Sequence, residues 1–194
     1  LMTTLLNQDQ VYYIHRLFSQ LSSILLESDI DWWLTGGTLL GAVRCGGMIQ
    51  HDDDIDIMMP ISQKELFIEL CESKLKFMRL ELKRPSNKYL KVIHPEWKGV
   101  WIDCCFCDEH GTDIRGHKAN RRYLEGEIFP LRYTQFSTFR RPLPIPCKSE
   151  EYLDRVFKNW RTEIAIYNHA DHKRNKQVVP LTPELNKCIV YHYK

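Results

Sequence analysis

Long hydrophobic runs are missing from the sequence. No apolar stretch among its 194 residues reaches the roughly 18 residues that a membrane-spanning helix needs. The N-terminus also lacks the charged and apolar regions of a signal peptide. These absences exclude a membrane-spanning segment and lead us to expect a cytoplasmic protein.

The sequence also has little net charge. Its 27 lysines and arginines nearly balance 25 aspartates and glutamates, leaving +2, so we expect no general affinity for nucleic acid. Repeats and low-complexity segments are absent. The length and a hydrophobic content of 43% are typical of a single globular domain.

Cysteine usage gives no sign of a disulfide framework. The count of seven is odd, and a core of this size does not need disulfides, so we expect reduced thiols. Cys104 and Cys107 have the CxxC spacing of a zinc site, with His94 and His110 nearby. A structural zinc usually needs a second closely spaced pair of ligands, which the sequence does not clearly provide. Small buried thiols on a strand are therefore the favoured interpretation.

What the sequence does contain is a concentration of aspartate at residues 52–56, DDDID. The alternation of Asp54 and Asp56 with apolar residues predicts a strand on which both carboxylates face the same side, about 6 to 7 Å apart. Carboxylates this close repel each other unless a cation lies between them. Hard oxygen ligands favour Mg²⁺ or Mn²⁺. The alternative is a solvated acidic turn.

The segment before the aspartates predicts a phosphate site. Residues 32–34 form a short apolar run, Gly36 and Gly37 interrupt it, and Thr38 opens a helical pattern. Backbone N–H groups at such a turn are free to bind phosphate, and the threonine can add a hydroxyl donor. A tight turn without a ligand is the alternative.

A third carboxylate, Asp103, lies in the otherwise apolar run VWIDCCF. A buried carboxylate is costly unless it is paired or bound to a metal, so we expect either a metal ligand or a salt-bridged structural residue. Periodicity further predicts helices at residues 8–29, 62–77, 116–127 and after Ser149, with Ser62 and Glu65 as a capping box for the second. Strands are expected at residues 78–83, 89–93 and 100–106, the first two as a hairpin.

The stretch GTLLGAVRCGGMIQHDDDIDI, residues 37–57, resembles the pattern of the LicD/fukutin family within the nucleotidyltransferase superfamily. Gln50 and His51 stand where the family usually has Pro and Trp. The resemblance implies an α+β (α/β) fold: a nucleotidyltransferase-like mixed β-sheet flanked by helices, in a single domain over 1–194. Its core would span about 30–108 and its C-terminal accessory part about 129–194.

By this resemblance the chain would be a metal-dependent phosphotransferase. It would move a phospho-alcohol, such as phosphocholine or ribitol phosphate, from a CDP-activated donor to a sugar hydroxyl of a glycan. Asp54, Asp56 and Asp103 would be the catalytic and metal-binding residues, with Asp103 able to act as base. Gly36, Gly37 and Thr38 would bind the donor phosphates.

Several alternatives stay open at this point. Arg44 would be a phosphate clamp or a salt-bridge partner of Asp52 or Asp53. The same carboxylates also suit a nucleotidyltransferase that transfers NMP and releases pyrophosphate, and an inactive binding scaffold is a third function. Eukaryotic relatives usually carry an N-terminal anchor, so the Golgi or secretory lumen is the alternative location if the chain has been trimmed.

Overall fold

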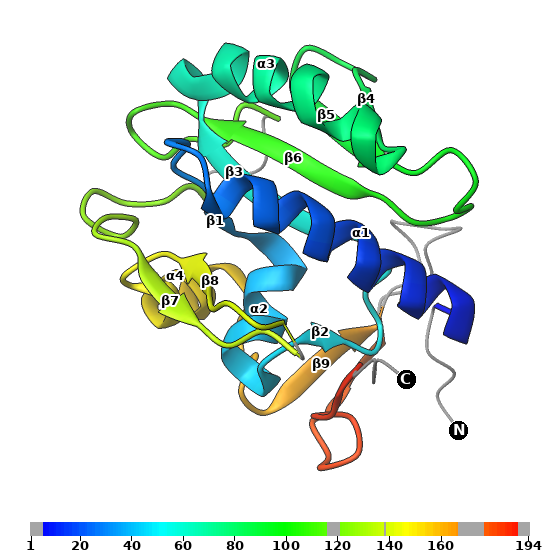
Figure 1. Ribbon diagram of the computed structural model, residues 1–194. Coiled ribbons are helices and arrows are strands. Elements are labelled where there is room, and N and C mark those ends of the chain that lie inside the picture. Colours follow the sequence, from blue (N-terminus) through cyan, green and yellow to red (C-terminus); the bar gives the residue numbers. More distant parts are fainter. Residues whose placement is uncertain (1–5, 116–120, 138, 167–176, 190–194) are drawn as a thin grey trace.

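A five-stranded mixed sheet lies at the centre of the computed structural model, which describes residues 6–115, 121–137, 139–166 and 177–189 (Figure 1). The strand order is β1-β3-β6-β5-β4. Only β3 and β6 are parallel, and the other neighbours are antiparallel. The predicted mixed sheet is thus confirmed. The strands are β1 Trp33–Leu34, β3 Ile55–Pro60, β4 Glu81–Lys83, β5 Tyr89–Ile93 and β6 Ile102–Cys107.

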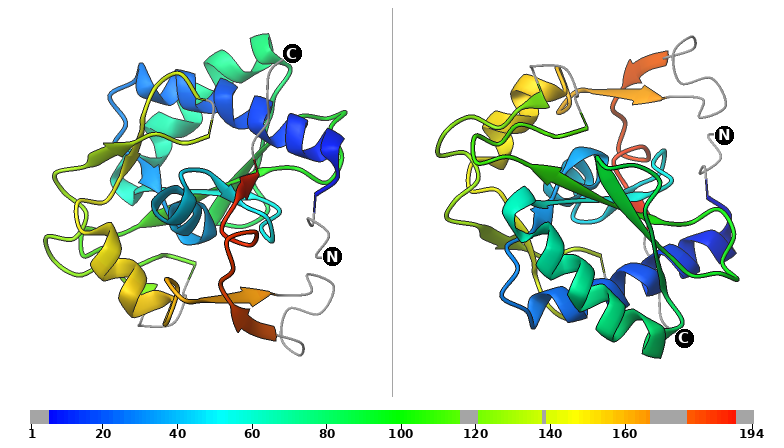
Figure 2. Two further views of the ribbon diagram at one scale, coloured as in Figure 1. Left: turned by 90° about the horizontal axis from the view of Figure 1, so that it is seen from below. Right: turned by 90° about the horizontal axis from the view of Figure 1, so that it is seen from above.

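The two faces of the sheet have different environments. Alternate residues of β3 and β6, such as Ile57, Cys104 and Phe106, are buried in the core. The helices α1 (Gln8–Leu26) and α3 (Lys64–Lys74) cover this face, as the two views in Figure 2 show. The intervening side chains, including Asp56 and Asp103, are on the opposite face, and the parallel register places these two residues directly beside each other.

The first helix begins with the capping residues that its sequence offers, whereas the start predicted for the helix after β3 is wrong. α1 begins with a reciprocal capping box between Asn7 and Gln10. The capping box predicted for Ser62 and Glu65 does not form. The 3-10 helix η1 (Ile61–Gln63) leads directly into α3, so part of the first turn's hydrogen bonding comes from this tighter helix. A second 3-10 helix, η2 (Leu75–Met78), shortens the strand expected at residues 78–83.

The helix predicted at residues 116–127 is wrong where it can be judged. Residues 116–120 lie outside the described residues, and residues 121–127 contain no α-helix but irregular backbone with a turn at 125–126. Tyr123 is held there by side-chain contacts: its ring stacks on Tyr152 with centroids 4.1 Å apart, and its hydroxyl lies 3.0 Å from Oγ1 of Thr35. Gly126 has φ +71°, which a right-handed helix does not allow. Tertiary packing therefore overrides the helical spacing.

The residues after 128 form smaller elements beside the sheet (Figure 1). Ser149, the expected cap of α4, is instead the first helical residue, and its hydroxyl donates a 2.6 Å hydrogen bond to the carbonyl of Pro146. The buried Glu127 carboxylate accepts hydrogen bonds of 2.5 and 2.6 Å from Arg155, which attaches α4 to the preceding loop. The elements are the pair β7 Arg132–Thr134 and β8 Leu143–Ile145, α4 Ser149–Val156, and the pair β9 Glu163–Ile166 and β10 Gln177–Pro180.

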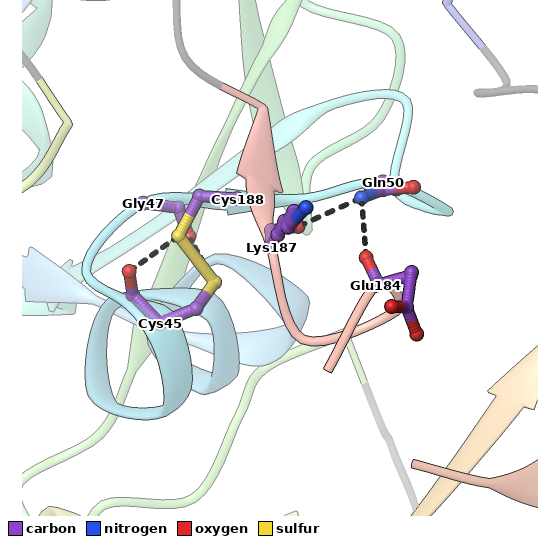
Figure 3. The surroundings of a disulfide bond; sticks show 6 residues. All are labelled: Cys45, Gly47, Gln50, Glu184, Lys187 and Cys188. Carbon is purple, nitrogen blue, oxygen red and sulfur yellow. Dashed lines mark hydrogen bonds between the residues drawn. A yellow bond between two sulfur atoms is a disulfide. The ribbon is translucent and has the colours of Figure 1, made fainter. Parts of the chain in front are cut away.

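A disulfide corrects the expectation that all thiols are reduced. Cys45 and Cys188 are bonded, with their Cα atoms 5.7 Å apart, and the other five cysteines are free. The bond lies beside a short sheet of β2 (Met48–Ile49) and β11 (Cys188–Ile189). Gln50 adds 3.1 Å hydrogen bonds to the carbonyls of Glu184 and Lys187 (Figure 3). The disulfide and this sheet thus attach a late segment of the chain to the loop that precedes the aspartates.

Candidate active site

Three aspartates from two parallel strands form a carboxylate cluster on the face of the sheet opposite α1 and α3. Asp54 precedes β3, Asp56 lies within it, and Asp103 comes from β6. Each offers an oxygen, and these three oxygens lie within 4.8 Å of one another. The side chains of Asp56 and Asp103 are only 18% and 13% exposed. The structure therefore brings together the three carboxylates that the sequence predicted as a group.

Burial and mutual repulsion disfavour the ionised forms of these carboxyl groups. Burial, together with the charges of Asp56 and Asp52, raises the pKa of Asp54 to about 9. Burial also raises the pKa of Asp56 to about 6, although Arg115 opposes the shift. A buried oxygen of Asp52, Oδ2, accepts no hydrogen bond within the described part of the chain. These oxygens fit Mg²⁺ or Mn²⁺, because a divalent cation would neutralise charges that burial and repulsion disfavour.

Gly36 and Gly37 leave space for the carboxylates of Asp56 and Asp52, respectively. The helix α2 (Gly36–Cys45) begins at Gly36, two residues before the predicted start, with Thr35 as its N-cap. A Cβ atom on Gly36 would lie 2.5 Å from Oδ2 of Asp56, and one on Gly37 would overlap Oδ2 of Asp52. The α2 N-terminus is therefore in direct contact with the carboxylates, and its first N–H groups lack intrahelical partners.

Thr38 and Arg44 occupy different ends of α2. Thr38 is 1% exposed, and its Oγ1 accepts a 2.8 Å hydrogen bond from the backbone N–H of Asp56, which aligns β3 with the helix. Arg44 lies eight residues after Gly36, about 12 Å along the axis at about 1.5 Å per residue. Its Nη1 donates to the carbonyl of Trp160 at 3.4 Å. Nε and Nη2 of Arg44 donate no hydrogen bond within the described residues, so the salt bridge to Asp52 or Asp53 that was the alternative for Arg44 is not found there.

Two cationic side chains at the carboxylate cluster, those of Lys91 and Arg115, were not predicted from the sequence. Nζ of Lys91, on β5, lies 3.2 Å from Oδ1 of Asp103 and 4.1 Å from the ring centroid of Trp101. Arg115 extends its guanidinium toward Asp56 and Asp103 from the segment after β6. The alternation of β5 could have placed Lys91 on this face. Nothing in the spacing of Arg115 could have predicted its position.

Among the residues that the structure describes, the CxxC cysteines belong to no group of side chains close enough to share an ion. Cys104 and Cys107 are buried on β6, which agrees with the favoured interpretation. In the described ranges, every group of three or more ligands close enough to share an ion consists of aspartates: Asp54 with Asp56 and Asp103, and Asp52 with Asp53 and Asp54.

The mixed sheet, the glycine turn and the adjoining carboxylates are the arrangement of a nucleotidyltransferase domain. Residues 29–148 match the family described as LicD/FKTN/FKRP, nucleotidyltransferase domain. The match covers more than half of the chain, and the chain belongs to this family. In the part of the chain that the structure describes, no helix is both long and apolar enough to cross a membrane.

Two rickettsial proteins resemble most of the chain. An uncharacterized protein of Rickettsia prowazekii (strain Madrid E) is 43% identical over 192 residues, covering 90% of this chain and 67% of that protein. An uncharacterized protein of Rickettsia typhi (strain ATCC VR-144 / Wilmington) is 25% identical over 191 residues, covering 94% of this chain. The chain spans only 60% of the length of the latter relative.

Solved structures show a more distant likeness. A crystal structure of ANT(2")-Ia in complex with adenylyl-2"-tobramycin has a TM-score of 0.45 and 14% identity, covering 68% of this chain and 67% of that one. The lincomycin-bound lincosamide antibiotic adenylyltransferase LnuA has a TM-score of 0.42 and 17% identity, covering 79% of this chain and 87% of that one.

Metal stabilisation is expected to depend on pH. Carboxyl groups whose pKa is raised in the folded protein stabilise it below their unfolded pKa, and this contribution is lost as the pH rises through the folded values. For Asp56 and Asp54 those values are about 6 and about 9. Mn²⁺ needs both groups ionised. The rise in Tm on adding Mn²⁺ should therefore grow from pH 6 to pH 8.5 in thermal melts, and a rise independent of pH would contradict this explanation.

Gly36→Ala is expected to weaken Mn²⁺ binding by about ten- to a hundredfold, the range for losing a group that orients a metal ligand. The new methyl group would displace the Asp56 carboxylate. The matched control is Gly46→Ala: Gly46 also has a positive φ, +77°, but open space where its Cβ would be. Both variants should lose similar backbone stability, and calorimetry should show weaker Mn²⁺ binding only for Gly36→Ala. Equal affinities in the two variants would contradict the contact.

Proposed function

We propose that the chain is a metal-dependent transferase that moves a phospho-alcohol from a CDP-activated donor to a sugar hydroxyl of a glycan. The observation that supports this most strongly is the carboxylate cluster of Asp54, Asp56 and Asp103 within a LicD-family domain. Family membership favours a transferase of phosphorus-containing groups, and the CDP-alcohol and glycan follow from the family resemblance.

In this proposal Asp54, Asp56 and Asp103 hold the cation. A Mg²⁺ or Mn²⁺ ion held by these residues would supply Lewis-acid polarisation and charge neutralisation at the donor phosphates. The N–H groups of Gly36 and Gly37 orient the same phosphates, helped by the partial positive charge of the α2 N-terminus. Thr38 aligns Asp56 through its hydrogen bond to the backbone.

Proton transfer is assigned to Asp103. Its carboxylate is close enough to the other two to share their ligand, and burial raises its pKa while the Lys91 charge opposes the shift. A carboxylate in this position can accept the proton of an incoming sugar hydroxyl. Arg44, at the far end of α2 from Gly36, would contact an anionic group of the donor or acceptor that lies away from the metal.

Product identity is the test of this function. The protein is incubated with Mn²⁺, a mixed glycan acceptor and one of CDP-choline, CDP-ribitol, CTP, UTP or ATP, and the nucleotides are separated by chromatography. The control variant combines Asp54→Ala with Asp56→Ala. CMP formed from a CDP-alcohol, only with metal and only by the intact protein, would support the proposal.

The other outcomes separate the alternatives. Pyrophosphate released from a triphosphate would indicate a nucleotidyltransferase in place of a phospho-alcohol transferase. If no product forms, thermal melts follow, because a ligand that binds the folded state raises Tm. A protein that is stabilised neither by Mn²⁺ nor by any of the nucleotides would be a binding scaffold, and the proposal would be abandoned.

A further inference from the structure

Arg115 brings a positive charge onto the carboxylates that would hold the metal. Its Nη1 atom lies 3.5 Å from Oδ1 of Asp56 and 4.0 Å from Oδ2 of Asp103. The side chain is only 19% exposed, so it is part of the site and not a solvated surface group. A guanidinium in this position occupies oxygens that a divalent cation would also approach.

A buried aspartate, Asp113, fixes the backbone and the Nε atom of Arg115. Asp113 is 7% exposed, and its Oδ1 accepts a 2.8 Å hydrogen bond from the backbone N–H of Arg115 while its Oδ2 accepts one of 3.3 Å from Nε. The segment itself is anchored to β6, because the N–H of Ile114 donates to the carbonyl of Phe106 at 2.9 Å. Backbone and Nε are thus fixed, and the terminal Nη groups point toward the cluster.

The position of Arg115 relative to α2 indicates what it can bind. Oδ2 of Asp56 packs against Gly36 at the N-terminus of α2, whereas Oδ1 of the same carboxylate faces Arg115. Any phosphate bound at this helix N-terminus beside a cation on Asp56 would therefore be within reach of the guanidinium. The planar fork of an arginine suits two phosphate oxygens at once.

We propose that Arg115 exchanges partners when the site is loaded. Without a cation, Arg115 neutralises Asp56 and Asp103. With Mn²⁺ on these carboxylates, the guanidinium is repelled from them and donates hydrogen bonds to a phosphate oxygen of the nucleotide donor. This inference rests on the proposed function, and it makes Arg115 a donor-binding residue that contacts the transferred or leaving phosphate.

Lys91 provides a matched comparison within the same cluster. Its Nζ also pairs with Asp103, at 3.2 Å, but it comes from β5, which lies on the side of β6 away from β3. Nζ of Lys91 also lies 4.1 Å from the ring centroid of Trp101, and no ion pair links it to Asp56 among the described residues. Both cations should oppose metal binding, and only Arg115 should assist phosphate binding.

The test measures two affinities by calorimetry in the wild type, Arg115→Gln, Arg115→Lys and Lys91→Gln. The first is that of Mn²⁺ alone, and the second is that of inorganic pyrophosphate at saturating Mn²⁺, a probe that does not depend on the base. Arg115→Gln should bind Mn²⁺ about fivefold more tightly, as expected for removing one nearby positive charge. It should bind pyrophosphate at least about tenfold more weakly, the scale of one lost charge-assisted hydrogen bond.

The control variants separate phosphate binding by Arg115 from the general effect of removing a positive charge. Lys91→Gln should also bind Mn²⁺ more tightly, with little change for pyrophosphate, and Arg115→Lys should retain part of the pyrophosphate affinity. Weaker Mn²⁺ binding by Arg115→Gln, or unchanged pyrophosphate binding by the same variant, would overturn the inference while leaving the proposed function intact. A wild type that binds neither Mn²⁺ alone nor pyrophosphate in the presence of Mn²⁺ would overturn the proposed function and the inference with it.

Discussion

Replacing Asp56 with asparagine is expected to abolish the rise in Tm caused by Mn²⁺ and to reduce the transfer activity strongly. The amide is close in shape to the carboxylate but carries no charge for the cation. The backbone N–H of residue 56 would still donate to Thr38, so the strand should remain in place. A bound metal contributes several kcal/mol to transition-state stabilisation, and activity should fall on the order of a thousandfold.

The same variant should be no less stable than the wild type when metal is absent. Burial raises the pKa of Asp56 to about 6, which means that its ionised form destabilises the metal-free protein above that pH. Thermal melts at pH 7.5 should therefore show an equal or higher Tm for Asp56→Asn without Mn²⁺. Asp31→Asn is the control, since Asp31 is exposed and accepts a hydrogen bond from Gln63 far from the cluster. An Asp56→Asn protein that Mn²⁺ still stabilises would contradict the metal site.

Reduction of the Cys45–Cys188 disulfide is expected to lower the free energy of unfolding by about 2 to 5 kcal/mol. The bond joins residues 143 apart in sequence, and a crosslink that closes so long a loop strongly restricts the unfolded chain. For a chain of this size the Tm should fall by roughly 5 to 15 °C. Dithiothreitol and the double variant Cys45→Ser with Cys188→Ser should give the same decrease.

Thiol counting provides an independent check of the disulfide. Alkylation of the unfolded protein without reductant should modify the five free cysteines, and all seven after reduction. Cys147→Ser is the matched control, because Cys147 is half-buried and forms no disulfide. Its Tm should respond to dithiothreitol as the wild type does. Seven modified thiols without reductant would show that the bond does not form in solution.

The sequence by itself determined the features whose signals are local. The alternation around Asp54 and Asp56 predicted a strand with both carboxylates on one face, and the apolar run around Asp103 predicted a second strand. The family was inferred from the motif at residues 37–57, the mixed sheet was implied by that resemblance, and the α1 helix was predicted from periodicity. Such patterns are readable because the period of a strand or helix assigns each side chain to a face.

Only the tertiary structure decided how distant segments meet. Arg115 contacts the carboxylates because the chain turns back along β6 once that strand has ended. Cys45 meets Cys188 because β2 pairs with β11. The helix expected at residues 116–127 failed where described because Tyr123 is held by Tyr152 and Thr35. These contacts join residues far apart in sequence, and no local period encodes them. Tertiary packing therefore decided that Arg115 reaches the predicted aspartates and that Cys45 meets Cys188.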